Sequence, residues 1–185
     1  MEQGKTAIAV RLEGLRPLMF DRYAGDNTTQ LPTADKMYLT PDHHLILPAL
    51  NLFSLLAAEN TKSVCRQFFG RAGRTIALGI NGFVNIVPYE IPLLGQEDKP
   101  IRFTGWNEQI TVHHAVARLP KGIPNPKERP RVEMPWALEI TVTYIKNQYC
   151  TLENLRQAFD WGGALGLGTF RPQHGRYELV QWDET

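Results

Sequence analysis

The chain has 185 residues, 43% of them hydrophobic, which is enough to bury the core of one domain. Its 20 basic and 19 acidic residues nearly cancel, so any site for a polyanion must be a local patch. Charged residues at Arg11, Glu13 and Arg16 interrupt the N-terminal segment, and we therefore expect neither a signal peptide nor a membrane span. Cys65 and Cys150 lack the spacing of a zinc site and indicate buried thiols in a reducing cytoplasm, with a disulfide as the alternative.

The first half of the chain alternates between strand and helix signals. Residues 7–15 alternate apolar and polar side chains, which is typical of a half-buried strand. A polar loop follows over residues 21–41, a length common in functional loops. Pro48 is placed to start a helix with Leu50 packed inward, and a second helical segment comes after it. Residues 76–87 then return to strand character.

The second half begins with a weaker pattern and ends with a clear one. Residues 108–117 are a candidate strand, and four prolines between residues 120 and 130 mark an extended arm. Residues 136–144 form the clearest strand of the chain because their apolar side chains alternate strictly. Thr151 caps a helix that turns Phe159 toward the core, and a last strand follows after a glycine-rich stretch.

Without the arm at about residues 88–135, the predicted order is strand, helix, strand, strand, helix, strand. This βαββαβ order predicts an α+β, ferredoxin-like fold, in which two helices cover one face of an antiparallel sheet. We expect a single domain over residues 1–185, with the arm inserted between the second and third core strands. Fold alone does not specify function.

The most informative segment is a glycine-rich stretch at residues 162–176, which holds five of the 15 glycines. Glycine permits positive φ and close backbone approach, so we expect a shaped loop in which Gly166 and Gly168 adopt such conformations. The loop also carries three donors suited to phosphate oxygens, which are Arg171, His174 and Arg176. A tight connection with solvated arginines is the alternative interpretation.

The arm concentrates positive charge. Between residues 118 and 131 the single acidic residue Glu128 faces five basic ones, namely Arg118, Lys121, Lys127, Arg129 and Arg131. The segment has a net charge of +4, so the rest of the chain has a net charge of −3. Prolines hold such a segment extended, and we expect it to follow a phosphate backbone. A solvated loop is the alternative.

Catalytic signatures are missing from the sequence. It has no serine elbow, no glycine loop ending in Gly-Lys-Ser and no His-Glu-x-x-His. The adjacent pairs His43-His44 and His113-His114 point to opposite faces of an extended chain and cannot bind one metal together. We expect no metal and no cofactor, and the sequence favours a binding protein over an enzyme.

The C-terminal motif carries a resemblance to a known family. Ala164 to Pro172, followed by Gly175 to Glu178, resembles the glycine-rich loop and last strand of the RAMP superfamily, the repeat-associated proteins that form the RNA-holding backbone of CRISPR effectors. The chain is also similar to small phage and prophage proteins with a Gly-Leu-Gly-Asp-(Phe or Trp)-Arg-Pro motif. That group shares a Pro-Leu-Met sequence, here Pro17-Leu18-Met19, and a hydrophobic-Pro helix start, here Leu47-Pro48.

The resemblance implies a ferredoxin-like core with a β-hairpin thumb at the position of the arm, and subunits stacked side by side along a guide RNA. It implies RNA contacts from the first helix, where Asn51 and Ser54 keep the polar character of the family's Ser-Ser-Leu-Lys-Gly-type start. Some members cleave target RNA with an aspartate before this helix. Asp35 lies in the matching region, without the double glycine that precedes the family's aspartate.

These features predict a cytoplasmic, RNA-binding backbone subunit of a CRISPR-like effector that holds single-stranded RNA through phosphate contacts and assembles with copies of itself and other effector subunits. No membrane partner is expected. A phage or mobile-element structural or assembly protein is a second interpretation, and an RNA-cleaving subunit using Asp35 is a third. The residues expected to contact nucleic acid are Arg16, Arg22, Asn51, Ser54, Arg118, Lys121, Lys127, Arg129, Arg131, Phe170, Arg171, His174 and Arg176.

Overall fold

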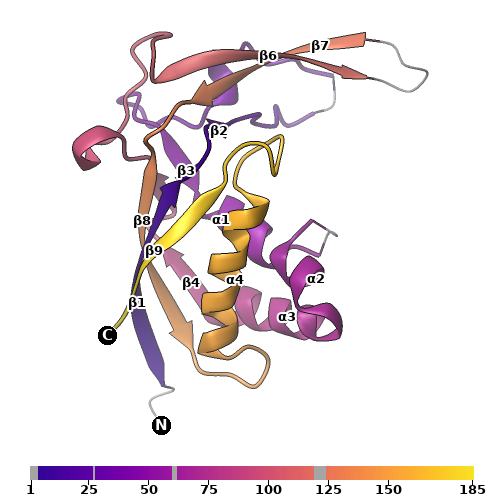
Figure 1. Cartoon of the computed structure of the whole chain (residues 1–185), viewed down its shortest axis with the longest axis vertical. Coiled ribbons are helices and arrows are strands. Elements are labelled where there is room, and N and C mark those ends of the chain that lie inside the picture. The colour runs from indigo at the N-terminus through magenta and orange to yellow at the C-terminus, as the bar shows by residue number, and fades with distance from the viewer. Residues whose placement is uncertain (1–3, 27, 60–61, 119–123) are drawn as a thin grey trace.

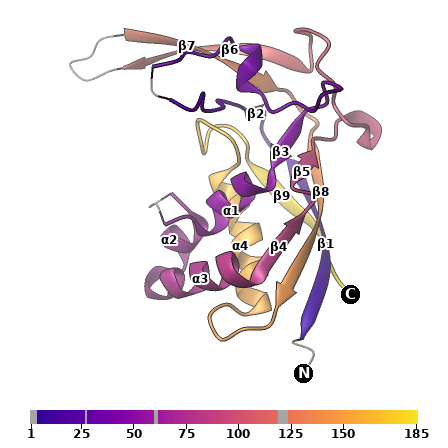
Figure 2. The ribbon, with the colours of Figure 1, turned by 180° about the vertical axis from the view of Figure 1, so that it is seen from behind.

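A four-stranded antiparallel sheet in the order β4-β8-β1-β9 forms the core, with helices on one face (Figures 1 and 2). The computed structural model describes residues 4–26, 28–59, 62–118 and 124–185. The strands of this sheet are β1 (Lys5–Gly14), β4 (Val84–Val87), β8 (Ala137–Ile145) and β9 (Tyr177–Glu184). The helices are α1 (Ala49–Ala57), α2 (Val64–Phe68), α3 (Gly73–Phe83) and α4 (Leu152–Leu165).

The connections confirm the predicted ferredoxin-like fold. Helices α1 to α3 lie in the connection from β1 to β4, and α4 leads from β8 to β9. Together with the sheet order this is the βαββαβ arrangement, with three helices where the sequence predicted two helical pieces. Among the described residues, no helix is long and apolar enough to cross a membrane.

Alternation along the strands separates a buried face from an open one. In β1, Ile8, Val10 and Leu12 are at most 2% exposed and face the helices. Leu138 and Val142 of β8 pair with this strand and are fully buried on the same side. These residues share the hydrophobic core with Leu155 and Phe159 of helix α4. The predicted Thr151 cap of this helix is present: the Thr151 side chain accepts a hydrogen bond from the backbone N–H of Asn154 at 3.1 Å.

The two predicted buried thiols, Cys65 and Cys150, are free and buried, and burial raises the pKa of Cys65 to about 12 and that of Cys150 to about 11.

Two sequence-based predictions about the helices are wrong. Residues 76–83 belong to helix α3, and the strand is limited to β4. The buried residues Ile76, Ala77 and Ile80 recur at helical spacing, which outweighs their strand propensity. Helix α1 also turns a different face inward, because Leu50 is 71% exposed. Its buried positions are Ala49, Leu52, Leu55, Leu56 and Ala57, so Asn51 and Ser54 are left near the surface.

A second sheet lies across one end of the core (Figure 1, top). It consists of β2 (Leu18–Met19), β6 (Ile110–Arg118) and β7 (Pro124–Val132), and β3 (Ile46–Pro48) pairs with β5 (Glu90–Pro92) in a separate ribbon. β6 and β7 form a long hairpin inserted between β4 and β8, which is the thumb-like arm of the predicted fold. In Figure 1 the hairpin extends over the helical side of the sheet.

The prolines of the arm lie within strand β7. Pro124, Pro126 and Pro130 occupy alternate positions, and the carbonyl of Pro130 accepts from Phe20 N on the edge that faces away from β6. Alternate residues of a strand direct their backbone groups to the same edge, so all three missing N–H groups fall on this outer edge. The arm is therefore a paired hairpin whose prolines remove no hydrogen bond from the β6–β7 ladder.

Candidate nucleic-acid interface

The glycine loop is shorter than predicted and is fixed to the β1–β2 connection. Helix α4 runs to Leu165, so two of the five glycines are helical and the loop spans residues 166–176. Gly166 and Gly168 have φ values of +81° and +72°, as expected from the sequence. Gly175 N donates to Pro17 O at 2.8 Å, and Thr169 N donates to Met19 O at 3.0 Å. Residues 17–19 and the glycine loop, two of the segments on which the family resemblance rests, are thus hydrogen-bonded neighbours.

One face of the hairpin packs on this loop. Residues His113 of β6 and Arg129 of β7 are register partners, and both side chains reach the Phe170 ring. The Arg129 guanidinium lies 4.5 Å from the Phe170 ring centroid, a cation–π contact. The rings of His113 and His174 lie 5.3 Å apart. Phe170 has a φ of +56°, which is unusual for an aromatic residue. Its side chain extends from the glycine loop and packs against the hairpin.

Burial is the main cause of low pKa values in this histidine pair. It lowers the pKa of His113 below its ordinary value, with a further contribution from the charge of Arg131. Burial also lowers the pKa of His174, and the charges of His113 and Arg131 lower it further. The neighbour His114 is on the opposite face of β6, where its Nδ1 lies 3.4 Å from Glu128. The adjacent histidines therefore diverge, as predicted.

Two of the five predicted arm cations are held in ion pairs. Arg129 donates to Asp21 at 2.7 Å, and its side chain is 11% exposed. Arg131 Nε donates to Glu133 at 2.7 Å. Lys127 is half-buried at the side of a cavity, and the side chain of Arg118 and the whole of Lys121 lie outside the described residues. Arg129 thus ties the hairpin to the segment after β2, whereas the Arg131 ion pair is local to β7 and the residue that follows it.

Arg171 has a different environment. It lies where two cavities of about 250 Å³ and 590 Å³ meet, and Gly168 and Thr169 line both of them. We call these joined cavities the groove. The guanidinium is half-buried, burial lowers its pKa, and Nη1 donates to Gly166 O at 3.3 Å. Among the described residues no carboxylate pairs with Arg171.

Donors and an aromatic ring surround Arg171 in the groove. Asn51 and Ser54 of α1 line its smaller cavity, and Phe170 lines its larger one. Lys62 and Gln67 also line the larger cavity and were not among the residues predicted from the sequence. A guanidinium with amide and hydroxyl groups beside it suits a phosphate, because each can donate to an anionic oxygen.

A third cavity of about 490 Å³ adjoins the groove and shares Asp21 with it. The segment at residues 21–36 forms one side, and β7 forms the other. Arg22 and Lys127 line this cavity, and the Arg22 guanidinium lies 6.0 Å from the Tyr38 ring. The three cavities together extend from α2, past the glycine loop and α1, to residues 126–128 of β7.

The remaining predicted residues lie around this region. Arg16 is exposed and its Nη1 reaches Gln173 O at 3.5 Å. Arg176 is half-buried, with Nε covered and without a hydrogen-bond partner in the described part of the chain. Asp35 is exposed in the short 3₁₀ helix η1 (Ala34–Lys36) and lines none of these three cavities. RNA cleavage by Asp35 stays a prediction.

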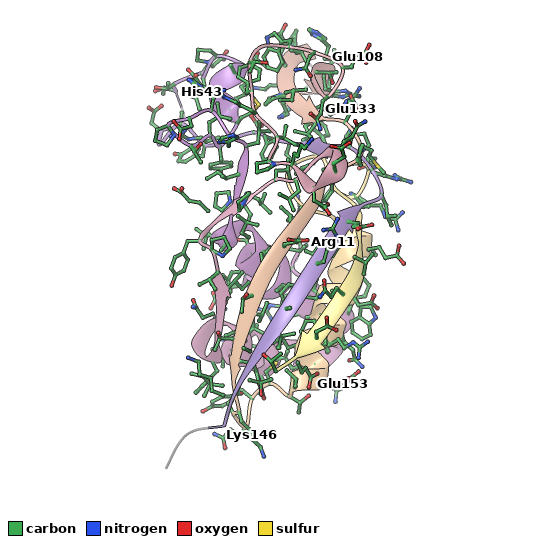
Figure 3. The ribbon with its side chains drawn as sticks, turned by 90° about the vertical axis from the view of Figure 1, so that its left-hand side faces the viewer. Arg11, His43, Glu108, Glu133, Lys146 and Glu153 are labelled. Atoms are coloured by element: carbon green, nitrogen blue, oxygen red, sulfur yellow. The ribbon has the colours of Figure 1, made fainter. Side chains whose placement is uncertain are left out.

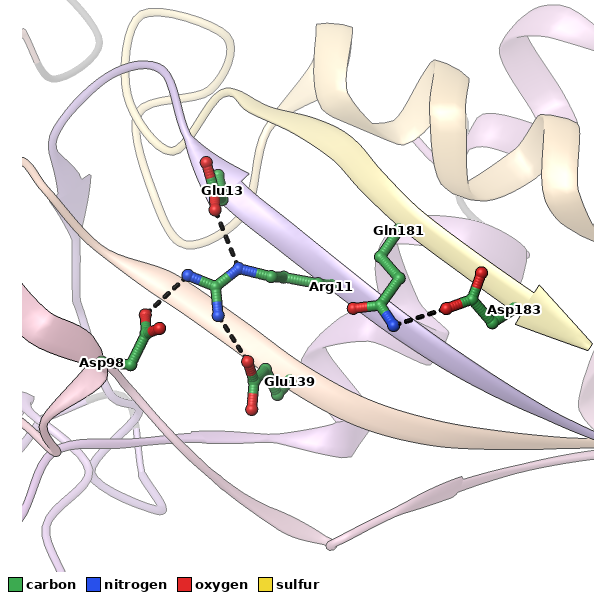
Figure 4. A network of polar contacts seen from close by, with 6 residues as sticks. All are labelled: Arg11, Glu13, Asp98, Glu139, Gln181 and Asp183. Carbon is green, nitrogen blue, oxygen red and sulfur yellow. Dashed lines mark hydrogen bonds and ion pairs between the residues drawn. The ribbon is translucent and has the colours of Figure 1, made fainter.

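The open face of the core sheet carries more negative than positive charge, in contrast to the cavities described above. Arg11 on this face contacts three carboxylates: it donates to Glu13 at 2.8 Å, to Asp98 at 2.6 Å and to Glu139 (Figures 3 and 4). The hydrogen bonds to Asp98 and Glu13 raise the pKa of Arg11. Asp183 adds another carboxylate beside this network. A surface with more anions than cations repels phosphate, so this face is unsuited to a polyanion.

No known family model matches the chain, and no curated protein matches it in sequence. The structure is similar to a chain in a cryo-EM structure described as type III-B Cmr-beta bound to cognate target RNA. The TM-score is 0.65 at 12% sequence identity, and the match covers 97% of this chain. It covers 60% of the other chain, so this protein spans about three fifths of the length of that relative. At this identity the likeness supports the fold.

Proposed function

We propose that this protein is an RNA-binding, RAMP-type subunit of a CRISPR-like effector and that it holds a single strand in the groove beneath the β6–β7 hairpin. Phosphate contacts supply most of the affinity, so binding depends little on sequence. The structural neighbour named above is bound to target RNA, and its shared fold supports this class of function.

Arg171 is the observation that carries the proposal. A half-buried guanidinium has lost part of its hydration, and a carboxylate normally replaces it, as Asp21 does for Arg129. Arg171 has no such partner in the described chain and lies beside Asn51 and Ser54 at the junction of two cavities. A phosphate in the groove would complete its coordination through a charge-assisted, bidentate contact.

Phe170 supplies the second element of recognition. Its ring is 38% exposed, lines the larger cavity and is held from the hairpin side by Arg129. A ring fixed in this way can stack against one base of a single strand without selecting its identity. The hairpin therefore supports the groove by positioning Phe170.

Assembly with further copies and with other effector subunits is part of the same proposal. The structural neighbour belongs to a complex described as type III-B Cmr-beta bound to cognate target RNA, which supports an assembly of several subunits. Mass measurement of the complex purified from its native cells, with the bound RNA sequenced, would test this assembly directly.

The decisive test is RNA binding by an Arg171→Gln variant, measured by fluorescence anisotropy on two unrelated single-stranded RNAs. Loss of a charge-assisted contact is expected to weaken both RNAs by about tenfold or more. Arg156→Gln is the matched control, because Arg156 is an exposed arginine of α4 beside a cavity on the far side of that helix. This control is expected to bind like the parent protein.

Arg171 also donates to Gly166 O, so its loss can disturb the loop. A second variant, Asn51→Ala with Ser54→Ala, alters the groove from α1 and keeps the loop intact. If both variants fold and bind RNA like the parent protein, the groove is not the binding site. A loss confined to one RNA sequence would instead assign base recognition to the groove.

A further inference from the structure

A second concentration of positive charge lies outside the hairpin. Between Glu59 and Glu90 the sequence contains no acidic residue and four basic ones, which are Lys62, Arg66, Arg71 and Arg74. All four side chains are exposed. They come from the residues just before α2, from α2 itself, from the following 3₁₀ helix η2 (Gly70–Ala72) and from the start of α3, and we call them the α2–α3 basic surface. This surface lies on the helical side of the molecule, away from the acidic sheet face (Figure 1).

The three arginines of this surface are not neutralised by the fold. Arg66 donates through Nε to the backbone carbonyl of Glu59 at 3.3 Å, and no described carboxylate pairs with Arg66, Arg71 or Arg74. Arg129 and Arg131 of the hairpin, in contrast, each have a carboxylate partner. The charges of these three arginines therefore remain available to an anionic ligand.

Aromatic side chains lie beside these arginines. Phe68 is 42% exposed, and its ring centroid lies 5.7 Å from that of Trp161 on α4. Phe69 packs on the other side of the contact, 4.9 Å from the same indole. Cations interspersed with a supported, partly exposed ring form the combination that holds single-stranded nucleic acid, because phosphates pair with the cations and bases stack on the ring.

The surface is continuous with the groove. Lys62 precedes α2 and Gln67 lies within it, and both line the larger cavity together with Phe170 and Arg171. A strand that leaves the groove at this end meets the arginines of α2 and η2 next. The acidic sheet face offers it no alternative path, because that face repels phosphate.

We propose that the α2–α3 basic surface is a second contact site for single-stranded nucleic acid and carries the strand beyond the groove. The inference rests on the proposed function, since it takes the groove as the first contact. It adds three phosphate contacts, from Arg66, Arg71 and Arg74, and one stacking position at Phe68. A longer single strand thus binds more tightly than one that fills the groove alone.

The test compares two RNA lengths across a range of salt concentrations. Oligonucleotides of about 5 and about 20 nucleotides bracket the usual site sizes of single-strand-binding domains. The variant Arg66→Gln, Arg71→Gln, Arg74→Gln is expected to bind the short RNA like the parent protein. For the long RNA, the slope of log affinity against log salt concentration is expected to be smaller by about 2 in this variant, because each of the three lost single-strand phosphate contacts contributes about 0.7. A control variant, Lys5→Gln, Lys99→Gln, Lys146→Gln, removes the same charge from exposed positions elsewhere and keeps the parent slope.

The outcomes separate this inference from the proposed function. An unchanged slope for the long RNA, with an unchanged melting temperature, overturns the inference and leaves the groove untouched. A parent protein that binds neither RNA overturns both. If Arg171→Gln binds like the parent protein and the triple arginine variant loses long RNA, the groove fails and the α2–α3 basic surface stands. Loss of self-association in sedimentation, with RNA binding intact, would identify the surface as a protein contact and overturn the inference.

Discussion

The surroundings of each arginine decide its role in this protein. Arg11, Arg129 and Arg131 each contact carboxylates and stabilise local structure. Arg171 contacts a backbone carbonyl, has no carboxylate partner in the described chain and borders the groove. A guanidinium keeps its charge in all these places, so the difference lies in whether an anion is already present. The role proposed for Arg171 is therefore ligand binding, whereas Arg129 ties the hairpin to Asp21.

The backbone conformation of Gly168 leads to a prediction about stability. At a φ of +72°, a Cβ on this residue would lie 2.3 Å from the carbonyl oxygen of Met19. Gly168→Ala is expected to lower the free energy of unfolding by about 3 kcal/mol, as the sum of left-handed strain and displacement of the backbone. Gly70→Ala is the control, because Gly70 has a φ of +55° with open space around its Cβ position. It is expected to cost about 1 kcal/mol; equal losses in denaturant unfolding would show that the Met19 contact is unimportant.

The histidine pair predicts a pH dependence of stability. Because burial lowers the pKa values of His113 and His174 in the folded state, the unfolded chain binds protons more readily as pH falls through 6.5. The contribution of this pair to the free energy of unfolding is therefore fully present above this pH and decreases as the pH falls toward about 5. Carboxylates are still ionised in this range, so their protonation does not mask the effect. The positive charges of Arg131 and Arg129 also disfavour protonation of His113, whereas the negative charge of Glu133 favours it.

Thermal melts at several pH values test this dependence. The melting temperature of the parent protein is expected to fall between about pH 7 and about pH 5, and His113→Gln with His174→Gln is expected to fall less. The variant His43→Gln with His44→Gln is the matched control, because the contacts of these two residues within the described chain are with Thr40, Arg102 and Phe103 and not with the hairpin, and it is expected to keep the parent profile. If the first variant also follows the parent profile, the pair does not titrate as described.

At the scale of elements, the hairpin is a paired structure anchored at its base. The nine-residue register between β6 and β7 and the addition of β2 give it a defined orientation over the groove. The Asp21–Arg129 ion pair ties β7 to the segment that follows β2. Removing either partner would leave the other half-buried and unpaired, and would release Phe170 from one side.

A double-mutant cycle measures this anchor. Asp21→Asn, Arg129→Gln and their combination are expected to show a coupling energy of about 1–3 kcal/mol in denaturant unfolding. Asp21 is a third exposed, which keeps the value below that of a fully buried pair. A cycle between Arg129 and Glu13, which lies on the open sheet face, supplies the uncoupled reference. Coupling no larger than that reference would mean that the hairpin is anchored by other contacts.

The sequence predicted elements best where one periodicity dominated. Strict alternation in 136–144 located β8, and the Thr151 cap located the start of α4, within a residue or two. Helix α3 was missed because its residues have high strand propensity and run into β4 without a loop, so helical spacing and strand composition disagreed. For the candidate site, the sequence indicated Phe170 and Arg171, which line the groove, but it gave no signal for the ion pair of Arg129, because its partner Asp21 lies 108 residues away in the sequence.

Charge separates the faces of the whole molecule. The open face of the sheet carries the Arg11 network with its excess of carboxylates, and the opposite side carries Arg171 and the α2–α3 basic surface. The near-neutral total of the chain conceals this division, because the two faces cancel in the sum. An absence of acidic residues from 60 to 89 was the available signal for the second basic region.

This division predicts which lysines an RNA will protect from chemical acetylation. Lys62 lines the groove and Lys127 lines the adjoining cavity, so both are expected to lose reactivity when single-stranded RNA binds. Lys5 and Lys146 lie at the opposite end of the core sheet and are expected to react equally with and without RNA (Figure 3 labels Lys146). Because phosphates shield only lysines within a few ångströms in physiological salt, the pattern maps the bound face. Protection of Lys5 and Lys146 with continued reactivity of Lys62 and Lys127 would place the RNA on the sheet side and contradict the charge argument.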